Sequence, residues 1–329
     1  MLYPLTFIPL FKERIWGGRK LQALFQKALP DAIPIGESWE ISDRAGDVSV
    51  IDRGALRGKD LRWLMQHHGE ALLGWKPRPE ETFPLLIKIL DAQEKLSLQV
   101  HPPAARAAAL GGEPKTEMWY IAEAEPGAQL FVGLNPDVTR EGFQEKIGDG
   151  TVAECFHRLD VSAGDAMFLP SGRVHAIGAG LVIFEIQQNS DTTYRVFDWN
   201  RIGPDGKPRA LHVAESLASI DFDDFAPALV SSPPAGMGSV SEQWLVDEPL
   251  FQVRSVNFEK SAIFPLVPGK AKVVGVVKGK VRVGSGGDPV VLNVGQFCLV
   301  PACLAEAIIE AKSEARILVA EPGRPACTL

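Results

Sequence analysis

Short apolar runs separated by glycine and proline dominate this chain of 329 residues. The 31 glycines and 25 prolines are spread evenly and interrupt the apolar runs after a few residues. Runs of this kind between turn-forming residues are typical of the strands of a β-barrel or β-sandwich. The predicted strands are Ser38–Ile41, Val48–Ile51, Leu85–Leu90, Leu96–Val100, Met118–Ala122, Gln129–Val132, Ala166–Leu169 and Val182–Gln187.

Three stretches have features of helices instead. Asp60–Leu73 carries leucines at positions 61, 64, 72 and 73, and Arg209–Ile220 has apolar residues at helical spacing. Thr139–Ile147 opens with a threonine that is suited to an N-cap. We expect all three helices to pack outside a barrel.

The chain is predicted to contain two related halves. A segment rich in serine, proline and glycine suggests a linker at about residues 227–241, and the region beyond it has an all-β pattern. GDAMFLP (164–170) and GQFCLVP (295–301) share a Gly-x5-Pro spacing, which indicates an internal duplication. All six histidines lie at or before His212. We therefore predict a metal-binding domain over residues 1–230, with helical insertions, and a second barrel without metal ligands over residues 241–329.

Composition excludes several classes of protein. Hydrophobic residues make up 46% and charged residues 23%, as in an average globular protein. The net charge of −7 argues against a surface for nucleic acid. We find neither a long uncharged apolar run nor a signal-peptide pattern, so no membrane association is expected. The four scattered cysteines indicate neither a disulfide framework nor a structural zinc site, and they fit a reducing cytoplasm.

The strongest chemical signal is a set of mixed nitrogen and oxygen ligands. Gln99 and His101 are two apart on a predicted strand, so both side chains point to the same face. Glu117 begins another predicted strand, and His175 follows a Gly-x5-Pro-x-Gly-x2-His turn. Two imidazoles, a carboxylate and an amide suit zinc, and also manganese, iron or cobalt. Without a thiolate, the set is typical of a catalytic site with open positions.

These segments resemble the motifs of the cupin superfamily. Cupins have His-x-His followed by Glu in the first motif, and the second motif matches here through His175. Two differences are Gln99 in place of the first histidine and a long spacer between His101 and Glu117. The resemblance implies a mainly β chain with two cupin (jelly-roll) β-barrels and a peripheral helical region.

Both differences are features of one family, the type I mannose-6-phosphate isomerases, and the chain is similar to its shorter bacterial form. The supporting segments are RIWGGRKL (14–21), GESWEIS (36–42), FPLLIKILDA (83–92), LSLQVHP (96–102), KTEMWY (115–120) and DTTYRVFDW (191–199). The resemblance implies one zinc ion per chain, although other divalent metals are conceivable, and a sugar phosphate as substrate. A monomer or a homodimer is expected. The metal ligands implied by the resemblance are Gln99, His101, Glu117 and His175.

The same resemblance implies that Arg195 is catalytic and that Lys115 is a cation of the active site. Lys88, Ser97, Lys115 and Arg195 are predicted to contact the substrate. An aldose–ketose isomerisation removes a proton beside a carbonyl and passes through an enediolate, which a Lewis acid and an arginine both stabilise. Metal-bound water and three side chains are conceivable bases, namely Glu117, Lys115 and Asp191. The pool of phosphate-binding cations is Arg14, Arg19, Lys88, Lys115 and Arg195.

Other interpretations stay open at this point. A metal-dependent cupin oxygenase and a non-catalytic sugar-binding cupin are the alternative functions. Arg195 could instead pair with Asp191 or Asp198 in a structural ion pair. Lys115 could be a solvated loop residue, and Lys88 could have a structural role. Ordinary structural roles are expected for His67, His68, His157 and His212.

Overall fold

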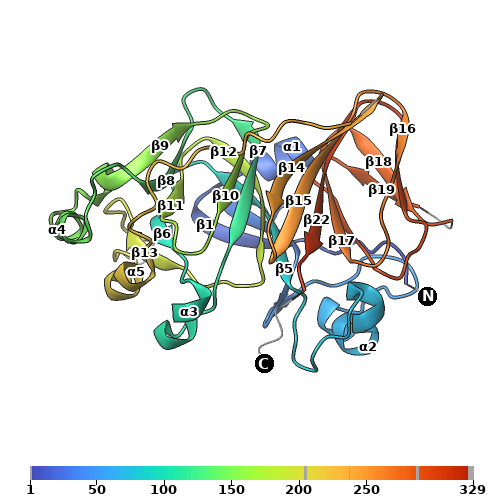
Figure 1. Cartoon of the computed structure of the whole chain (residues 1–329), viewed down its shortest axis with the longest axis horizontal. Coiled ribbons are helices and arrows are strands. Elements are labelled where there is room, and N and C mark those ends of the chain that lie inside the picture. The colour runs from blue at the N-terminus through green and yellow to red at the C-terminus, as the bar shows by residue number, and fades with distance from the viewer. Residues whose placement is uncertain (1, 204–205, 237, 287–288, 325–329) are drawn as a thin grey trace.

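Two β-barrels lie side by side in the computed structural model, as Figure 1 shows. The structure describes residues 2–203, 206–236, 238–286 and 289–324. Each barrel is built from two antiparallel sheets, which confirms the prediction of a mainly β chain with two barrels. Among the described residues, no helix combines the length and the apolar character that crossing a membrane requires.

The first barrel is formed by a six-stranded and a five-stranded sheet. The six-stranded sheet has the order β1 (Leu10–Gly18), β2 (Ile35–Ile41), β5 (Leu85–Ala92), β12 (Leu181–Gln188), β7 (Glu117–Ala124) and β10 (Ala166–Leu169). The five-stranded sheet has the order β13 (Tyr194–Phe197), β6 (Leu98–Val100), β11 (His175–Ile177), β8 (Gln129–Leu134) and β9 (Phe156–Asp160).

The second barrel repeats this arrangement with a five-stranded and a four-stranded sheet. The five-stranded sheet has the order β14 (Val240–Asp247), β15 (Phe251–Phe258), β22 (Ala315–Pro322), β17 (Lys272–Lys278) and β20 (Phe297–Val300). The four-stranded sheet has the order β16 (Ala262–Pro265), β21 (Ile308–Ala311), β18 (Lys280–Gly284) and β19 (Val290–Asn293).

Apart from β1 and β13, which have no counterpart in the second barrel, the strands of the two barrels occur in corresponding order. The order β2-β5-β12-β7-β10 recurs as β14-β15-β22-β17-β20, and β6-β11-β8-β9 recurs as β16-β21-β18-β19. The two Gly-x5-Pro segments occupy equivalent edge strands, β10 and β20. This topology supports the internal duplication that the sequence indicates. In the first barrel, β7 begins at Glu117, whereas its counterpart β17 begins at Lys272.

One predicted strand is not formed as expected. Val48–Ile51 is not continuous, because β4 (Asp47–Val48) pairs only with β3 (Asp43–Arg44). Val50 and Ile51 instead make isolated bridges to Asp60 and Phe7 respectively. The chain changes partners within four residues, so no ladder continues through this segment.

Two predicted helices are present, and the N-cap expected at Thr139 is formed. The side chain of Asp60 accepts a hydrogen bond at the start of α2 (Leu61–Leu73), and that of Thr139 does so at the start of α4 (Arg140–Asp149). The third helix, α5 (Val213–Ser219), is shorter than predicted. Short helices α1 (Lys20–Phe25) and α3 (Ala104–Ala107) and the 3₁₀ turns Ala108–Leu110 and Val152–Cys155 complete the helical content of the described residues.

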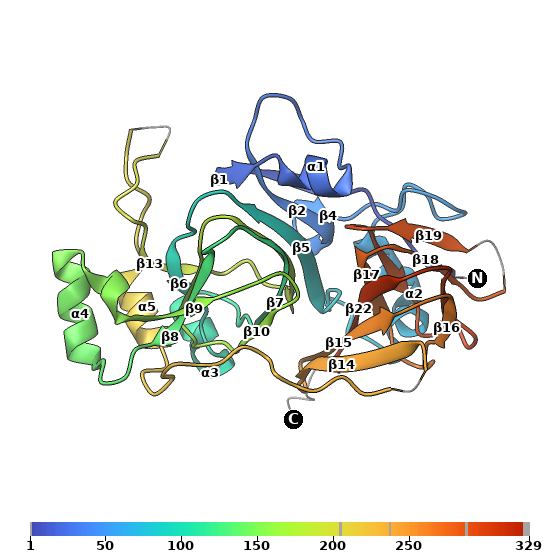
Figure 2. The ribbon, with the colours of Figure 1, turned by 90° about the horizontal axis from the view of Figure 1, so that it is seen from above.

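The helices do not all cover the first barrel. Helices α4 and α5 lie outside it, on the side away from the second barrel (Figure 2), but α2 lies beneath the second barrel in Figure 1. The last turn of α2 receives hydrogen bonds from the second barrel, with the N–H groups of Ala271 and Ala302 bound to the carbonyls of Leu73 and Leu72. The N-terminal quarter of the chain therefore joins the two barrels, although it falls within the predicted domain 1–230.

Gly74 ends α2 at this junction, and its position predicts that a side chain there would destabilise the protein. Its φ of +93° is left-handed, and a Cβ atom there would lie 2.0 Å from the carbonyl oxygen of Gly269. We expect Gly74→Ala to lower the free energy of unfolding by about 3 kcal/mol, through backbone strain and this collision. Gly58→Ala is the matched control, since Gly58 has a φ of +84° and a Cβ atom added there would meet open space.

Urea unfolding followed by circular dichroism measures both variants. Gly58→Ala should lose about 1 kcal/mol from the left-handed backbone alone. Equal losses in the two variants would show that the contact between Gly74 and the second barrel has no energetic weight.

Candidate metal centre and cavity

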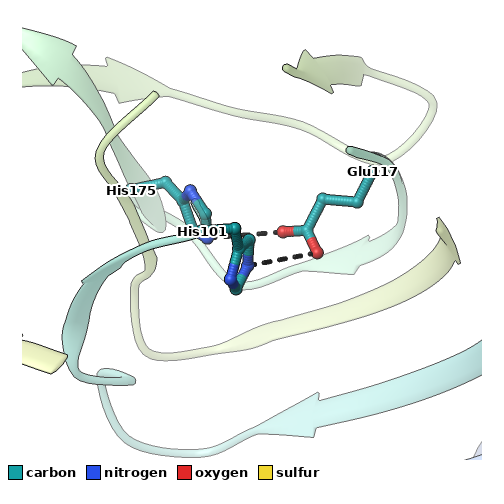
Figure 3. A group of neighbouring side chains, drawn as sticks. All are labelled: His101, Glu117 and His175. Atoms are coloured by element: carbon teal, nitrogen blue, oxygen red, sulfur yellow. Dashed lines mark ion pairs between the residues drawn. The ribbon is translucent and has the colours of Figure 1, made fainter. Parts of the chain in front are cut away.

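Three buried side chains of the first barrel converge on one point, as Figure 3 shows. The potential ligand atoms of His101, Glu117 and His175 all lie within 4.8 Å of one another. The Oε2 and Oε1 atoms of Glu117 are 3.5 Å from Nε2 of His101 and 3.3 Å from Nε2 of His175. Among the described residues, this is the one group of three or more histidine, cysteine or acidic residues with such geometry.

The barrel strands place these residues. His175 begins β11 and stands opposite Gln99 of β6, while His101 directly follows β6. Glu117 begins β7 in the other sheet. The three side chains therefore come from both walls of the barrel and meet in its interior. No single segment of the sequence contains this juxtaposition.

The imidazoles are oriented by backbone carbonyls. Nδ1 of His101 donates a hydrogen bond to the carbonyl of Thr192 (2.8 Å), and Nδ1 of His175 donates to that of Arg173 (2.9 Å). Each Nε2 is thereby left with a lone pair directed toward the centre, as in metal-binding histidines.

Several buried polar atoms at this centre lack the partners that buried groups normally have. Nε2 of His101 and both carboxylate oxygens of Glu117 have no hydrogen bond of good geometry, although all three are buried. Burying such atoms without hydrogen bonds costs free energy, which the ion pair between Oε2 and Lys115 offsets only in part, and a bound cation would be a partner for all three atoms. The group therefore fits a divalent metal ion.

Gln99 lies at the same centre. Its amide nitrogen is 3.2 Å from Nε2 of His175, and so donates to the lone pair that a metal would take. Rotation of the amide would present its oxygen instead. The structure thus brings together all four side chains that the sequence nominates.

The electrostatic environment favours the protonation states that metal binding needs. Burial and then the Lys115 cation lower the pKa of His101 to about 4, although Glu117 opposes them. His101 is therefore neutral at pH 7. Burial opposes ionisation of Glu117, but Lys115 and the two histidines outweigh it and hold its pKa well below the usual range. Glu117 is therefore a carboxylate.

Lys115 is a buried residue and not a solvated loop lysine. Its Nζ lies 2.9 Å from Oε2 of Glu117. Burial disfavours its charge, but Glu117 and then Glu185 outweigh this and raise its pKa. Lys115 is accordingly an ammonium ion beside the candidate ligands.

A polar cavity of about 400 Å³ opens beside the metal centre. All four predicted substrate contacts line it, namely Lys88, Ser97, Lys115 and Arg195. Arg14 of the predicted phosphate pool also lines it, but Arg19 does not. The Arg19 side chain is turned to Gln22 and to backbone carbonyls of the following loop, so that part of the prediction is not supported.

Two carboxylates of the cavity are absent from the predicted site. Glu185 lies in the apolar strand β12, stands opposite Lys88 on β5, and is 3.2 Å from its Nζ. It also accepts a hydrogen bond from the indole of Trp119 (2.9 Å). Both Lys88 and Glu185 are buried and line the cavity. Lys88 is thus a lysine of the barrel interior.

Glu37, the second of these carboxylates, extends the row of charges along the sheet. It accepts hydrogen bonds from Arg14 (2.8 Å) and from the indole of Trp39 (2.6 Å). Burial raises the pKa of Glu37, but Lys88 and Arg14 outweigh it and lower the pKa to about 2. In the sequence, Glu185 and Glu37 stand out only as single charged residues within or next to predicted strands. The pairing of neighbouring strands is needed to show which cations they contact.

Arg195 occupies the wall beside the metal centre. It lies on β13 opposite Gln99, and its guanidinium donates to the carbonyl of Ala210 (2.9 Å). Its buried Nε has no hydrogen-bond partner. The alternative ion pair with Asp198 is not formed, because that carboxylate binds Arg201 and Arg209.

Two imidazoles and a carboxylate, set beside a polar cavity in the first of two barrels, define a cupin with a candidate metal site. Comparison with known proteins narrows this class. Residues 5–126 match the family model described as phosphomannose isomerase type I, catalytic domain. The chain is 35% identical over 318 residues to the probable mannose-6-phosphate isomerase GmuF of Bacillus subtilis, covering 95% of this chain and 98% of that protein.

Further relatives agree. The mannose-6-phosphate isomerase of Streptococcus mutans is 34% identical, with 92% of this chain and 93% of that protein covered. The crystal structure of the Bacillus subtilis mannose 6-phosphate isomerase has a TM-score of 0.88 at 28% identity, covering 97% and 99% of the two chains. The chain belongs to the type I mannose-6-phosphate isomerase family.

Proposed function

We propose that this protein interconverts mannose 6-phosphate and fructose 6-phosphate with one divalent metal ion per chain. Family membership supports the reaction, because the relatives carry the name of this activity. The observation that carries the proposal is the convergence of His101, Glu117 and His175 beside the polar cavity. A compact polar cavity of about 400 Å³ suits a sugar phosphate better than a macromolecule.

Zinc is the metal we propose. His101, Glu117 and His175 would hold it together with Gln99, a mixed nitrogen and oxygen set that zinc accepts in catalytic sites. A zinc-bound mannose 6-phosphate isomerase has the same fold, with a TM-score of 0.77 at 16% identity. When bound, the ion would supply a Lewis acid for the oxygens at C1 and C2 of the sugar.

The surrounding side chains would orient the substrate and balance its charge. Lys115, held as an ammonium ion beside Glu117, would donate hydrogen bonds to a sugar oxygen. Arg195 would place a permanent positive charge close to the oxygen on which the enediolate charge develops. Glu185 and Asp191 are cavity carboxylates outside the ligand group, and are therefore candidates to carry the proton between carbons.

A metal-dependent oxygenase and a non-catalytic sugar-binding protein are the competing functions. The oxygenase requires molecular oxygen, so turnover of mannose 6-phosphate under anaerobic conditions would exclude it. A binding protein would show no turnover at all. The cytoplasmic location and the monomeric or homodimeric state stay predictions.

Removal of the metal tests the proposed function. Treatment with a chelator is expected to abolish conversion of mannose 6-phosphate to fructose 6-phosphate, because the carboxylate and imidazoles alone provide no comparable Lewis acid. Addition of one equivalent of zinc should restore the activity. A coupled assay that follows fructose 6-phosphate measures both steps. Undiminished turnover in fully metal-free protein, or no turnover of any hexose 6-phosphate with zinc present, would contradict the proposal.

A further inference from the structure

The cations that line the cavity differ in how far their charge is neutralised. Arg14 pairs with Glu37 at 2.8 Å, Lys88 with Glu185 at 3.2 Å, and Lys115 with Glu117 at 2.9 Å. Each of these three cations therefore has its own carboxylate. Such pairs leave little net charge to attract an anion from solution.

Positive charge is in surplus at one place. The guanidinium groups of Arg201 and Arg209 both bind the carboxylate of Asp198, and that of Arg195 lies near enough to interact with them electrostatically without forming an ion pair. Arg209 binds both oxygens of Asp198 through Nε (2.7 Å) and Nη2 (2.5 Å), and Arg201 shares one of them. Among the described residues, Arg195 has no ion-pair partner. Arg201 also lies 3.8 Å from the carboxylate of Glu94. The three arginines, Asp198 and Glu94 thus leave a net charge of about +1, since arginine stays protonated.

The cluster faces the site. Arg195 and Arg209 both line the cavity, whereas Arg201 does not and donates instead to the carbonyl of Lys95. Burial lowers the pKa of Arg195, and the neighbouring Arg209 lowers it further, which reflects the positive potential there. An anion in the cavity would therefore meet the unpaired charge of Arg195 and the guanidinium of Arg209, which lines the same cavity.

We propose that Arg209 binds the phosphate group of the substrate and makes the site selective for phosphorylated sugars. A phosphate monoester carries a charge of about −1.5 to −2 at pH 7, opposite in sign to the surplus of the cluster. Guanidinium groups suit phosphate because of their planar arrangement of donors. Asp198 holds Arg209 in place through Nε and Nη2, and among the described residues no hydrogen bond occupies Nη1 of Arg209. This inference rests on the proposed function.

The test compares a phosphorylated with an unphosphorylated ligand. Sorbitol 6-phosphate and sorbitol lack a carbonyl, so the enzyme cannot isomerise them and their binding is measured at equilibrium. Titration calorimetry on zinc-loaded wild-type and Arg209→Met proteins gives both dissociation constants, with displacement titration for the weaker ligand. We expect Arg209→Met to raise the dissociation constant of sorbitol 6-phosphate by at least about tenfold and that of sorbitol by less than about twofold. Added salt should weaken sorbitol 6-phosphate binding more steeply in wild type than in Arg209→Met.

Two further variants complete the test. Arg209→Lys keeps the charge without the planar donor arrangement, so its affinity for sorbitol 6-phosphate should fall between those of wild type and Arg209→Met. If Arg209→Met does not fold, Arg209→Lys is compared with wild type in its place. Arg57→Met removes an exposed arginine of the loop before α2 and should match wild type. Equal weakening of both ligands, or unchanged binding of sorbitol 6-phosphate, would overturn the inference. Turnover of mannose 6-phosphate by wild type is assayed separately. Failure of the proposed function can therefore be distinguished from failure of the inference about Arg209.

Discussion

Replacement of Glu117 by glutamine is expected to reduce kcat/KM for mannose 6-phosphate by roughly a thousandfold or more. The carboxylate contributes the only negative charge among the four proposed ligands, and its two oxygens face both histidines. A neutral amide binds a divalent cation far more weakly, and loss of the Lewis acid forfeits several kcal/mol of transition-state stabilisation. Metal analysis of the purified variant should find almost no zinc, whereas wild type should contain about one equivalent per chain.

Glu123→Gln provides the matched control for this variant. Glu123 lies on the same strand, β7, but its carboxylate pairs with Lys20 at the surface of the barrel. We expect zinc content and kcat close to those of wild type. Retention of a full equivalent of zinc and of wild-type activity in Glu117→Gln would remove Glu117 from the ligand group.

The second large effect is expected at Arg195. Arg195→Ala should lower kcat by about 10²–10³-fold, because a fixed positive charge beside the metal centre would be lost where negative charge develops on the substrate. The unpartnered Nε and the position opposite Gln99 place this charge within the cavity wall. Arg195→Lys should recover part of kcat, since it keeps the charge but not the donor arrangement.

Steady-state kinetics at saturating mannose 6-phosphate measures kcat, and circular dichroism checks that each variant is folded. Arg158→Ala is the control, because Arg158 is an exposed arginine on β9 of the same five-stranded sheet. An unchanged kcat in Arg195→Ala would show that this residue has no part in the chemical step.

Much of this architecture follows from local patterns in the sequence. Thr139 is expected to cap a helix, and α4 begins directly after it. The leucine pattern of residues 60–73 likewise corresponds to α2, which Asp60 caps. The candidate ligands are recognisable because Gln99 and His101 share one face of a strand and because His175 follows a characteristic turn. These patterns are local, so they can be recognised without knowledge of the fold.

Features that depend on pairing between distant strands could not be predicted. Glu185 sits within an apolar strand, and its importance appears only once β12 is in register with Lys88 on β5. Arg209 falls inside the predicted helix, whereas the helix begins at Val213 and Arg209 turns to Asp198 instead. The strand β1 is also absent from the predicted strands, because its polar residues and the glycines at its end obscure the alternation that marks an edge strand.

The position of the metal is the central claim, and anomalous X-ray diffraction from crystals of the zinc-loaded protein tests it directly. Data collected on either side of the zinc absorption edge should give one strong peak per chain, in contact with Nε2 of His101, Nε2 of His175 and the carboxylate of Glu117, with Gln99 beside it. An empty centre together with zinc bound elsewhere on the chain would contradict the account.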